Sequence, residues 1–265
     1  MRTVAIASQK GGVAKTTTTI NLAAALAEVG NEVLVIDLDP QRNASEWMRI
    51  PDARPGMLEA LQGEVGFDSL VEPTPIPNVS IVPSSSWLVG AERVLAAEMG
   101  SDSLLRQAIE TLPAAQRWDF LLVDCPPSLG LLVVNALAAV NEVLIPVAAH
   151  AMGLTGLTKM LDSVERARKR LNPRIGVVGI LPCRVDLRTR HATESVERIR
   201  ERFGSAVFDV LIRENIRLAE APSYGQSVLT YAPSSAGATD YRALAGELLA
   251  RSPIAREAQH AEAEA

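Results

Sequence analysis

The sequence predicts an α/β fold, with a doubly wound, mostly parallel sheet and helices on both of its faces. Short runs rich in valine, isoleucine and leucine alternate with longer helical segments, which is the order of parallel strands joined by crossover helices. Aromatic residues make up only 4% of the chain, a composition that fits a parallel sheet under helices better than an antiparallel sandwich. With 265 residues, 48% of them hydrophobic, the chain can bury one full core.

We expect one domain over residues 1–251 and a frayed tail, rich in alanine and glutamate, over residues 252–265. The first strand, Thr3–Ser8, alternates and is β-branched, and the first helix, Lys15–Val29, stops at Gly30. Further strands are expected at Glu32–Asp39, Val79–Pro83, Trp118–Asp124, Glu142–Val147, Ile175–Leu181 and Val207–Ile212. Further helices are expected at Leu88–Met99, Ser103–Leu112, Leu129–Val140, Leu154–Leu171, Thr189–Phe203 and Ala238–Ala250. Ligands of such folds bind at the carboxyl ends of the strands.

Composition excludes several classes of protein. Two cysteines, Cys125 and Cys183, cannot form a disulfide framework or a four-cysteine zinc site, and we interpret both as small buried residues. The three histidines are too widely spaced to predict a metal site. No signal peptide opens the chain, and its longest apolar stretch, Leu129–Ala149, is interrupted by polar residues and a proline. We therefore expect a cytoplasmic protein without a membrane span.

Charge is distributed unevenly along the chain. Residues 1–150 carry a net charge of −8, residues 151–217 a net charge of +6, and residues 218–265 a net charge of −3. The basic segment is either a solvated, arginine-rich helical surface or a face that binds a polyanion. Charge alone leaves both interpretations open.

The segment between the first strand and the first helix has the context of a phosphate-binding loop. It consists of Lys10, Gly11, Gly12, Val13, Ala14, Lys15, Thr16 and Thr17. Small residues let backbone N–H groups close around phosphates, and the following helix N-terminus adds positive potential. Lys15 can reach the β- and γ-phosphates, and Thr16 can bind Mg²⁺. The general pattern G-x-x-x-x-G-K-[ST] is not met, because Gln9 and Ala14 stand at its glycine positions; a turn that merely joins strand to helix is the alternative.

The stretch QKGGVAKTTTTINLAAALA at residues 9–27 resembles the deviant phosphate loop of the ParA/MinD ATPases, KGGxGK[ST]. The resemblance covers roughly residues 2–250 and implies a deviant P-loop NTPase that binds ATP and Mg²⁺. It implies that Lys10 reaches across a nucleotide-sandwich homodimer to the ATP of the partner subunit. Ala14 replaces the usual glycine, and its methyl group is compatible with the loop if the backbone there keeps a negative φ.

Aspartates follow two of the predicted strands. The stretch Asp37-Leu38-Asp39-Pro40-Gln41 is similar to the DxDPQ segment of the family, and Asp124-Cys125-Pro126-Pro127 is similar to its Walker B segment. The resemblance implies that Asp39 positions the attacking water, that Asp37 lies near the metal, and that Asp124 holds Mg²⁺ through water. Each aspartate alone could simply cap a helix. Together, beside a lysine-containing loop, they favour phosphoryl transfer.

Two later stretches resemble chromosomal-type ParA, also called Soj. They are NIRLAEAPSYG at residues 215–225 and DLRT at residues 186–189. The resemblance implies that Arg188 and Arg217, both in the basic segment, bind double-stranded DNA nonspecifically, and that Arg184 and Pro222 flank the adenine. The chain departs from the family where Arg213-Glu214 replaces Pro-Arg and where residues 148–154 lack an aromatic pair.

The resemblance implies a partitioning ATPase with a slow basal turnover. ATP closes the dimer, the dimer binds the nucleoid, and a ParB-like partner stimulates hydrolysis and release. The alternatives are a MinD-like positioning regulator, a positioner of a protein cargo such as a carboxysome or chemosensory cluster, and an iron–sulfur reductase on the same fold. The tail after Arg251 has few large apolar residues, which argues against a membrane-binding helix. The sequence identifies neither the cargo nor the partner.

Overall fold

The computed structural model of the chain describes residues 1–113, 118–149 and 153–251. Its sheet has eight strands in the order β3-β4-β2-β5-β1-β6-β7-β8. Every neighbouring pair is parallel except β3 and β4. The strands are β1 (Arg2–Ile6), β2 (Val33–Asp37), β3 (Glu72–Pro73), β4 (Val79–Val82), β5 (Phe120–Asp124), β6 (Glu142–Ala148), β7 (Gly176–Val185) and β8 (Ile212–Arg213). From β1 the chain passes to β2, β3 and β4 on one side, returns through β5 beside β1, and then continues through β6, β7 and β8 on the other side. This doubly wound order confirms the predicted fold class.

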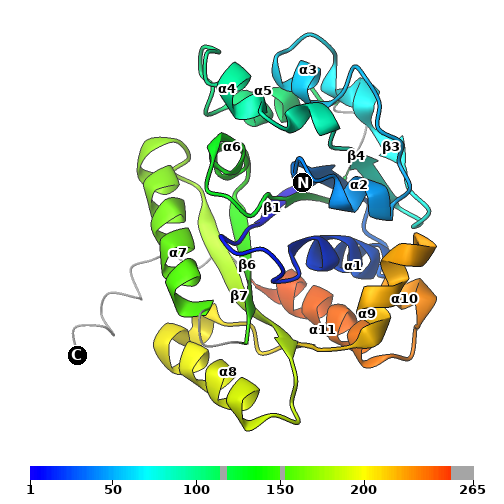
Figure 1. The fold of residues 1–265 in the computed structure, drawn as a ribbon, viewed down its shortest axis with the longest axis vertical. Helices are drawn as coiled ribbons and strands as arrows, with labels where there is room; N and C mark the ends of the chain where they lie inside the picture. Colours follow the sequence, from blue (N-terminus) through cyan, green and yellow to red (C-terminus); the bar gives the residue numbers. More distant parts are fainter. Residues whose placement is uncertain (114–117, 150–152, 252–265) are drawn as a thin grey trace.

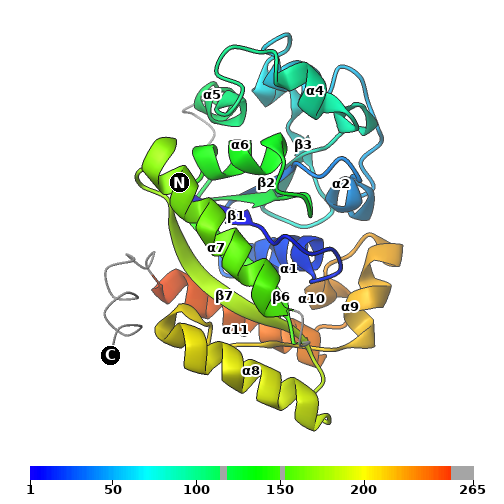
Figure 2. The same cartoon turned by 60° about the vertical axis from the view of Figure 1, so that its left-hand side comes forward.

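Helices cover both faces of this sheet (Figures 1 and 2). They are α1 (Lys15–Glu28), α2 (Asn43–Trp47), α3 (Met57–Leu61), α4 (Ala91–Leu95), α5 (Leu104–Glu110), α6 (Leu131–Ala139), α7 (Gly153–Arg170), α8 (Arg190–Phe203), α9 (Ile216–Glu220), α10 (Val228–Tyr231) and α11 (Ala236–Ala250). One hydrophobic core lies under α5, α6 and α7, and another lies under α1 and α11. Successive strand residues point to opposite faces; thus Ala5 joins the first core, whereas Val4 and Ile6 join the second.

The central helix α1 begins directly after the glycine-containing loop. Four threonines follow Lys15 at its start and alanine and leucine fill its second half, and most of its residues are buried, because α1 lies between the sheet and α11. Deep in this interface the hydroxyls of Thr18 and Tyr241 are 3.3 Å apart. Just beyond the helix, Gly30 has a φ of 92°, which glycine adopts without steric cost. The helix therefore ends where the sequence predicts.

The expected strand at Val207–Ile212 is wrong. Only Ile212–Arg213 pairs with β7, and Val207 forms a single bridge to Ile180. The backbone N–H groups of Asp209 and Val210 donate instead to the carboxylate of Glu247 on α11, each at 2.9 Å. A side chain from α11 thus takes the hydrogen bonds that a strand would have made.

The helix expected at Leu88–Met99 is also shorter than expected, since α4 covers only Ala91–Leu95 and follows Gly90 at a φ of 83°. The short helices α2, α3, α9 and α10 were not expected at all. The expected tail at residues 252–265 lies outside the described residues. Among the described residues, no helix is both long and apolar enough to cross a membrane.

Candidate functional site

A cavity of about 640 Å³ opens at the carboxyl edge of the sheet, beside β1 and β2. Parallel doubly wound sheets bind ligands at this edge, where the strand order reverses. Three groups of lining residues belong to predicted motifs: Gly11, Gly12, Ala14, Lys15, Thr16 and Thr17 from the loop after β1; Asp39 and Gln41 from the segment after β2; and Arg184 and Pro222 from the opposite wall. The structure therefore brings together segments that are far apart in the sequence.

The loop after β1 owes its shape to two residues with left-handed backbone. Gly12 has a φ of 72°, and Ala14 has a φ of 71° and a ψ of 34°. The condition under which the methyl group of Ala14 would fit the loop easily, a negative φ, is not met, because the chain turns sharply before entering α1. A residue with a Cβ carries a steric cost in this conformation. The loop accepts this cost at the position directly before Lys15.

Two lysines lie in this loop. Lys15 is buried, lines the cavity and donates from Nζ to the backbone carbonyl of Lys10 at 3.2 Å. Lys10 and Val13 instead line a smaller neighbouring cavity of about 230 Å³. A Cβ atom built on Gly156 of α7 would lie 3.4 Å from Cγ of Lys10. Within one copy of the chain, Lys10 thus lies toward α7, whereas Lys15 serves the main cavity.

Asp124 ends β5 below the loop and is fully buried. The hydroxyl of Thr16 donates to its Oδ2 at 2.7 Å, and the hydroxyl of Thr19 donates to its Oδ1 at 3.1 Å. Burial, reinforced by the carboxylate of Asp37, raises the pKa of Asp124 to about 8. The two hydroxyls and the ammonium group of Lys15 act in the opposite direction.

The residues around Asp124 fit a magnesium ion. Magnesium prefers oxygen ligands, and here a hydroxyl and a carboxylate oxygen are in contact. Thr16 also lines the main cavity, so its oxygen lies between the buried carboxylate and the space open to a ligand. Positive charge at this point would offset the cost of burying an ionised carboxylate.

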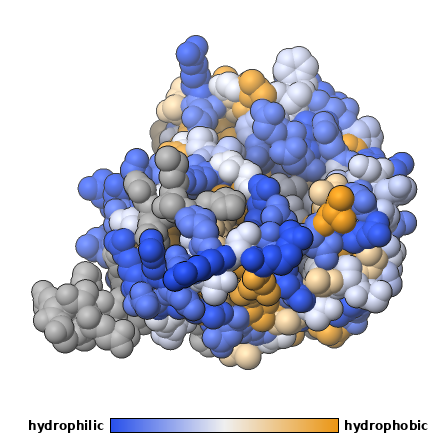
Figure 3. Space-filling view, turned by 60° about the horizontal axis from the view of Figure 1, so that its bottom comes forward, coloured by the Kyte–Doolittle hydropathy of each residue, from blue (hydrophilic) through white to orange (hydrophobic). Residues whose placement is uncertain are grey.

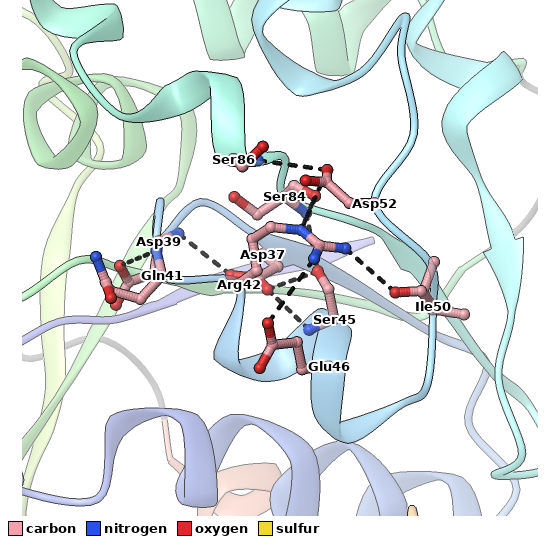
Figure 4. A network of polar contacts seen from close by, with 10 residues as sticks. All are labelled: Asp37, Asp39, Gln41, Arg42, Ser45, Glu46, Ile50, Asp52, Ser84 and Ser86. Carbon is pink, nitrogen blue, oxygen red and sulfur yellow. Dashed lines mark hydrogen bonds and ion pairs between the residues drawn. The ribbon is translucent and has the colours of Figure 1, made fainter.

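Asp37 and Asp39 have different surroundings, although Asp37 is the last residue of β2 and Asp39 follows two positions later (Figure 4). Oδ2 of Asp37 accepts from the backbone N–H of Ser45 at 2.8 Å and from its hydroxyl at 2.7 Å. Asp37 pairs in register with Asp124, and burial raises the pKa of Asp37 to about 6. Asp39 lines the cavity, and its Oδ1 accepts from the N–H of Gln41 at 3.0 Å. Asp37 therefore binds the start of α2, whereas Asp39 borders the ligand space.

The opposite wall contains the predicted Arg184 and Pro222. Arg184 donates from Nη1 to the carbonyl of Gly12 at 3.2 Å, so it also contacts the phosphate loop. The cavity is also lined from α2 by Asn43 and Trp47, which were not predicted from the sequence. Their helix has only five residues and gives no periodic signal.

Arg188 and Arg217 lie outside the cavity. The side chain of Arg188 is 89% exposed and pairs with Asp186 at 2.8 Å; that of Arg217 is 52% exposed and pairs with Glu220 at 2.7 Å. Each ion pair forms within one local segment, the first in the loop before α8 and the second in α9. Figure 3 shows the side of the molecule on which α8 lies, where much of the visible surface is hydrophilic.

Sequence comparisons identify the family. A family model described as "AAA domain" matches residues 1–177. The chromosome-partitioning ATPase Soj of Thermus thermophilus is 43% identical over 251 residues, which cover 95% of this chain and 96% of that protein. The chromosome partitioning protein ParA of Caulobacter vibrioides is 38% identical over 253 residues, covering 95% of both chains. The chain belongs to the ParA/Soj family of partitioning ATPases. The motifs at the cavity are therefore those of a ParA/Soj protein.

Solved structures extend this similarity to the fold. The cobyrinic acid a,c-diamide synthase of Mycobacterium smegmatis, with bound ATP analog and magnesium, has a TM-score of 0.81 and 31% identity, covering 94% of each chain. The cell division ATPase MinD of Pyrococcus furiosus has a TM-score of 0.77 and 28% identity, covering 94% of this chain and 98% of that one. A protein of closely similar fold thus binds an ATP analog and magnesium.

Proposed function

We propose that this chain is an ATP-dependent partitioning ATPase whose two copies close around ATP. The observation that carries the proposal is the convergence of Lys15, Thr16 and Asp39 on one cavity of about 640 Å³. Phosphoryl transfer needs cations on the phosphates, a metal and a group that orients water. Lys15 provides a cation, Thr16 and the adjacent Asp124 provide oxygen ligands for a metal, and Asp39 provides a carboxylate that can orient water.

The residues have separate roles in this proposal. The Lys15 ammonium group and the backbone N–H groups of the loop bind the phosphates. Thr16 and Asp124 hold magnesium, which supplies positive charge to the phosphate oxygens when it is bound. Asp37 lies near the metal, as the resemblance of its motif implies. The carboxylate of Asp39 orients the attacking water, while Arg184 and Pro222 border the adenine.

Lys10 completes the site in a homodimer, where it reaches the ATP of the partner subunit. Its position outside the main cavity of its own copy supports this role. ATP would then act as the bridge between the copies, so that dimerisation reports the nucleotide state. A long-lived dimer agrees with slow turnover in the absence of an activator.

The ATP-bound dimer binds double-stranded DNA nonspecifically, through Arg188, Arg217 and other cations of residues 151–217. A ParB-like partner stimulates hydrolysis and releases the protein, which is cytoplasmic and associated with the nucleoid. The likeness to MinD and to apo McdA of Cyanothece (TM-score 0.82, 25% identity) keeps positioning of a protein cargo as a second candidate. DNA binding by the ATP form separates nucleoid-based mechanisms from a MinD-like one.

The substitution Lys15→Ala tests nucleotide binding. The control is Lys159→Ala, because Lys159 is an exposed lysine on α7. A fluorescent ATP analogue should bind wild type and Lys159→Ala alike and should not bind Lys15→Ala, because a methyl group cannot replace a charge-assisted contact. Unchanged affinity of Lys15→Ala would show that the loop is only a connection between strand and helix.

Dimerisation is tested by size-exclusion chromatography with Mg-ATP. Asp39→Ala should bind ATP but hydrolyse it far more slowly, and should therefore remain a dimer. Lys10→Ala should also lose hydrolysis, but through weaker dimerisation. A wild-type protein that turns over normally as a monomer would contradict the sandwich arrangement.

A further inference from the structure

Arg42 has an unusual environment for an arginine. It ends the turn that carries Asp39, and its side chain is only 10% exposed. Arginine is seldom buried unless its charge is paired. Its backbone is left-handed, with a φ of 58° and a ψ of 24°. The N–H of Arg42 donates to the carbonyl of Asp39 at 2.9 Å, so this residue closes the turn that begins at Asp39.

The guanidinium group of Arg42 joins this turn to two other segments (Figure 4). Nε donates to the backbone carbonyl of Ser84 at 3.1 Å, and Nη2 donates to that of Ile50 at 3.2 Å. Carboxylates of Asp52 and Glu46 lie 3.4 Å and 3.9 Å from the group. One side chain thus links the end of β2 with the chain after α2 and with the chain after β4.

A second set of hydrogen bonds, through Ser45, also joins the end of β2 to the chain after β4. The hydroxyl of Ser45 donates to Asp37 and accepts from the N–H of Ser84, at 2.7 Å and 2.9 Å. Ser84 is buried, and its own hydroxyl has no hydrogen-bond partner among the described residues. Its polar bonds to the β2–α2 region therefore run through its backbone, to Ser45 and to Arg42.

We infer that Arg42 is a positioning residue, whose guanidinium group fixes the turn that holds Asp39 against the ligand cavity. Arg42 does not line this cavity, whereas Asp39 and Gln41 do, so its effect passes through the turn. A turn that needed only its left-handed backbone would be served better by glycine. The inference rests on the proposed role of Asp39 in hydrolysis.

Two substitutions separate the side chain from the backbone. Arg42→Gly relieves the left-handed conformation but removes the guanidinium group, and Arg42→Lys keeps the charge but cannot donate to both carbonyls in the same planar geometry. We expect kcat for ATP to fall on the order of tenfold to a hundredfold in both variants, because small displacements of a catalytic group have effects of this size. KM and the affinity for a fluorescent ATP analogue should stay within about twofold, since the phosphate loop is untouched.

A matched control is Arg54→Ala. Arg54 lies in the segment that Arg42 contacts and pairs with Glu59 at 2.6 Å, but within the described part of the chain it makes no hydrogen bond or ion pair to the Asp39 turn. Normal turnover of this variant would show that a general disturbance of the segment is not enough to slow hydrolysis. A fall equal to that of Arg42→Gly would contradict the specific role of Arg42.

A double substitution tests whether Arg42 acts through Asp39. Combining Arg42→Gly with Asp39→Ala should slow hydrolysis no further than Asp39→Ala alone. The fluorescence anisotropy of Trp47, which lies in α2, is a readout that does not depend on turnover. All proteins in this measurement also carry Trp87→Phe and Trp118→Phe, so that Trp47 is the single source of tryptophan fluorescence. Arg42→Gly should lower this anisotropy, because α2 loses one of its anchors.

The outcomes distinguish this inference from the proposed function. A wild type that binds and hydrolyses ATP, with Arg42→Gly and Arg42→Lys equally active, would overturn the inference alone. Additive losses in the double variant would overturn action through Asp39. If Arg42→Gly fails to fold, Arg42→Lys carries the same comparison. A wild type without ATP hydrolysis would overturn the proposed function, and with it the role of Arg42.

Discussion

At the scale of single residues, Ala14 carries a measurable strain. A left-handed conformation costs a residue with a Cβ roughly 1–2 kcal/mol, whereas glycine adds about 0.4–1 kcal/mol of flexibility to the unfolded chain. We therefore expect Ala14→Gly to raise the free energy of unfolding by about 0.5–1 kcal/mol. Urea unfolding without nucleotide measures this change. Ala23→Gly, inside α1, is the control, and this substitution should lower the free energy of unfolding by about 1 kcal/mol. A less stable Ala14→Gly would contradict the left-handed backbone.

Asp124 connects stability to pH. Its pKa is about 8 in the folded protein against an ordinary value of 3.8, so the folded protein holds a proton that the unfolded chain releases between these values. The folded state therefore binds more protons in this window, and the stability contributed by the group is lost as the pH rises from about 4 to about 8. Asp37, with a pKa raised to about 6, acts in the same direction.

We expect Asp124→Asn to melt at a higher temperature than wild type at pH 8 when metal and nucleotide are absent, because a neutral amide replaces a buried negative charge. The difference should shrink as the pH falls toward 4. Thermal melts at several pH values test this, with the exposed Asp68→Asn as control. Mg-ATP should stabilise the wild type but not Asp124→Asn, since the latter lacks the carboxylate. Equal pH dependence of all three proteins would contradict the shift at Asp124.

At the scale of elements, long and buried segments were predictable, and short ones were not. The apolar runs that became β2 and β5 and the alanine-rich α1 carry their signals locally. Helices of four or five residues, such as α2 and α9, depend on distant partners. The first residues of α2 are held by Asp37, and the segment after Val207 is held by Glu247 of α11. No local pattern reveals such tertiary hydrogen bonds.

The same division applies to the cavity. Lys15, Thr16 and Asp39 were predictable, because each stands in a motif at a strand end. The left-handed backbone of Ala14 was not, since the sequence shows no dihedral angle. The burial of Arg42 depends on carbonyl groups that fold against it from other segments, so its side chain could not be distinguished from the other arginines.

Arg251, the last residue of the predicted domain, is bound to several groups of the fold. Its guanidinium group donates to the carbonyls of Ser205 and Val207, at 3.2 Å and 2.7 Å, and pairs with Glu247 at 2.6 Å. A chain truncated after Arg251 should unfold at the same urea concentration as the full chain. Truncation after Ala250 should lower the free energy of unfolding by about 1–3 kcal/mol, because the part-buried carbonyl of Val207 and the carboxylate of Glu247 lose a charged donor. Equal stability of the two truncations would contradict this anchoring role.

At the scale of the whole molecule, the proposed DNA binding would have to arise from a local surface, since the net charge is −5. Dimerisation would place two copies of the basic segment on one rigid body, which gives a physical reason for dependence on ATP. In the isolated chain both guanidinium groups are already paired, that of Arg188 with Asp186 and that of Arg217 with Glu220. Phosphate oxygens must compete with these carboxylates for the guanidinium groups.

We therefore expect the double variant Arg188→Ala and Arg217→Ala to bind DNA more weakly, with nucleotide binding and dimerisation retained. Each phosphate contact contributes about −0.9 to the slope of log K against log salt. Loss of about four contacts in a dimer should flatten this slope by roughly 3 to 4 units. The measurement is DNA affinity with ATP at several salt concentrations.

The ion pairs provide controls in both directions. Asp186→Asn together with Glu220→Gln keeps both guanidinium groups and removes their competitors, so DNA binding should strengthen. Arg242→Ala removes an arginine that pairs with Glu28 at 2.6 Å but lies outside the basic segment, so the slope should not change. A double arginine variant with the slope of wild type would show that residues 151–217 are only a solvated surface. A strong preference of the wild type for one sequence would contradict nonspecific binding, because contacts to phosphates carry no information about bases.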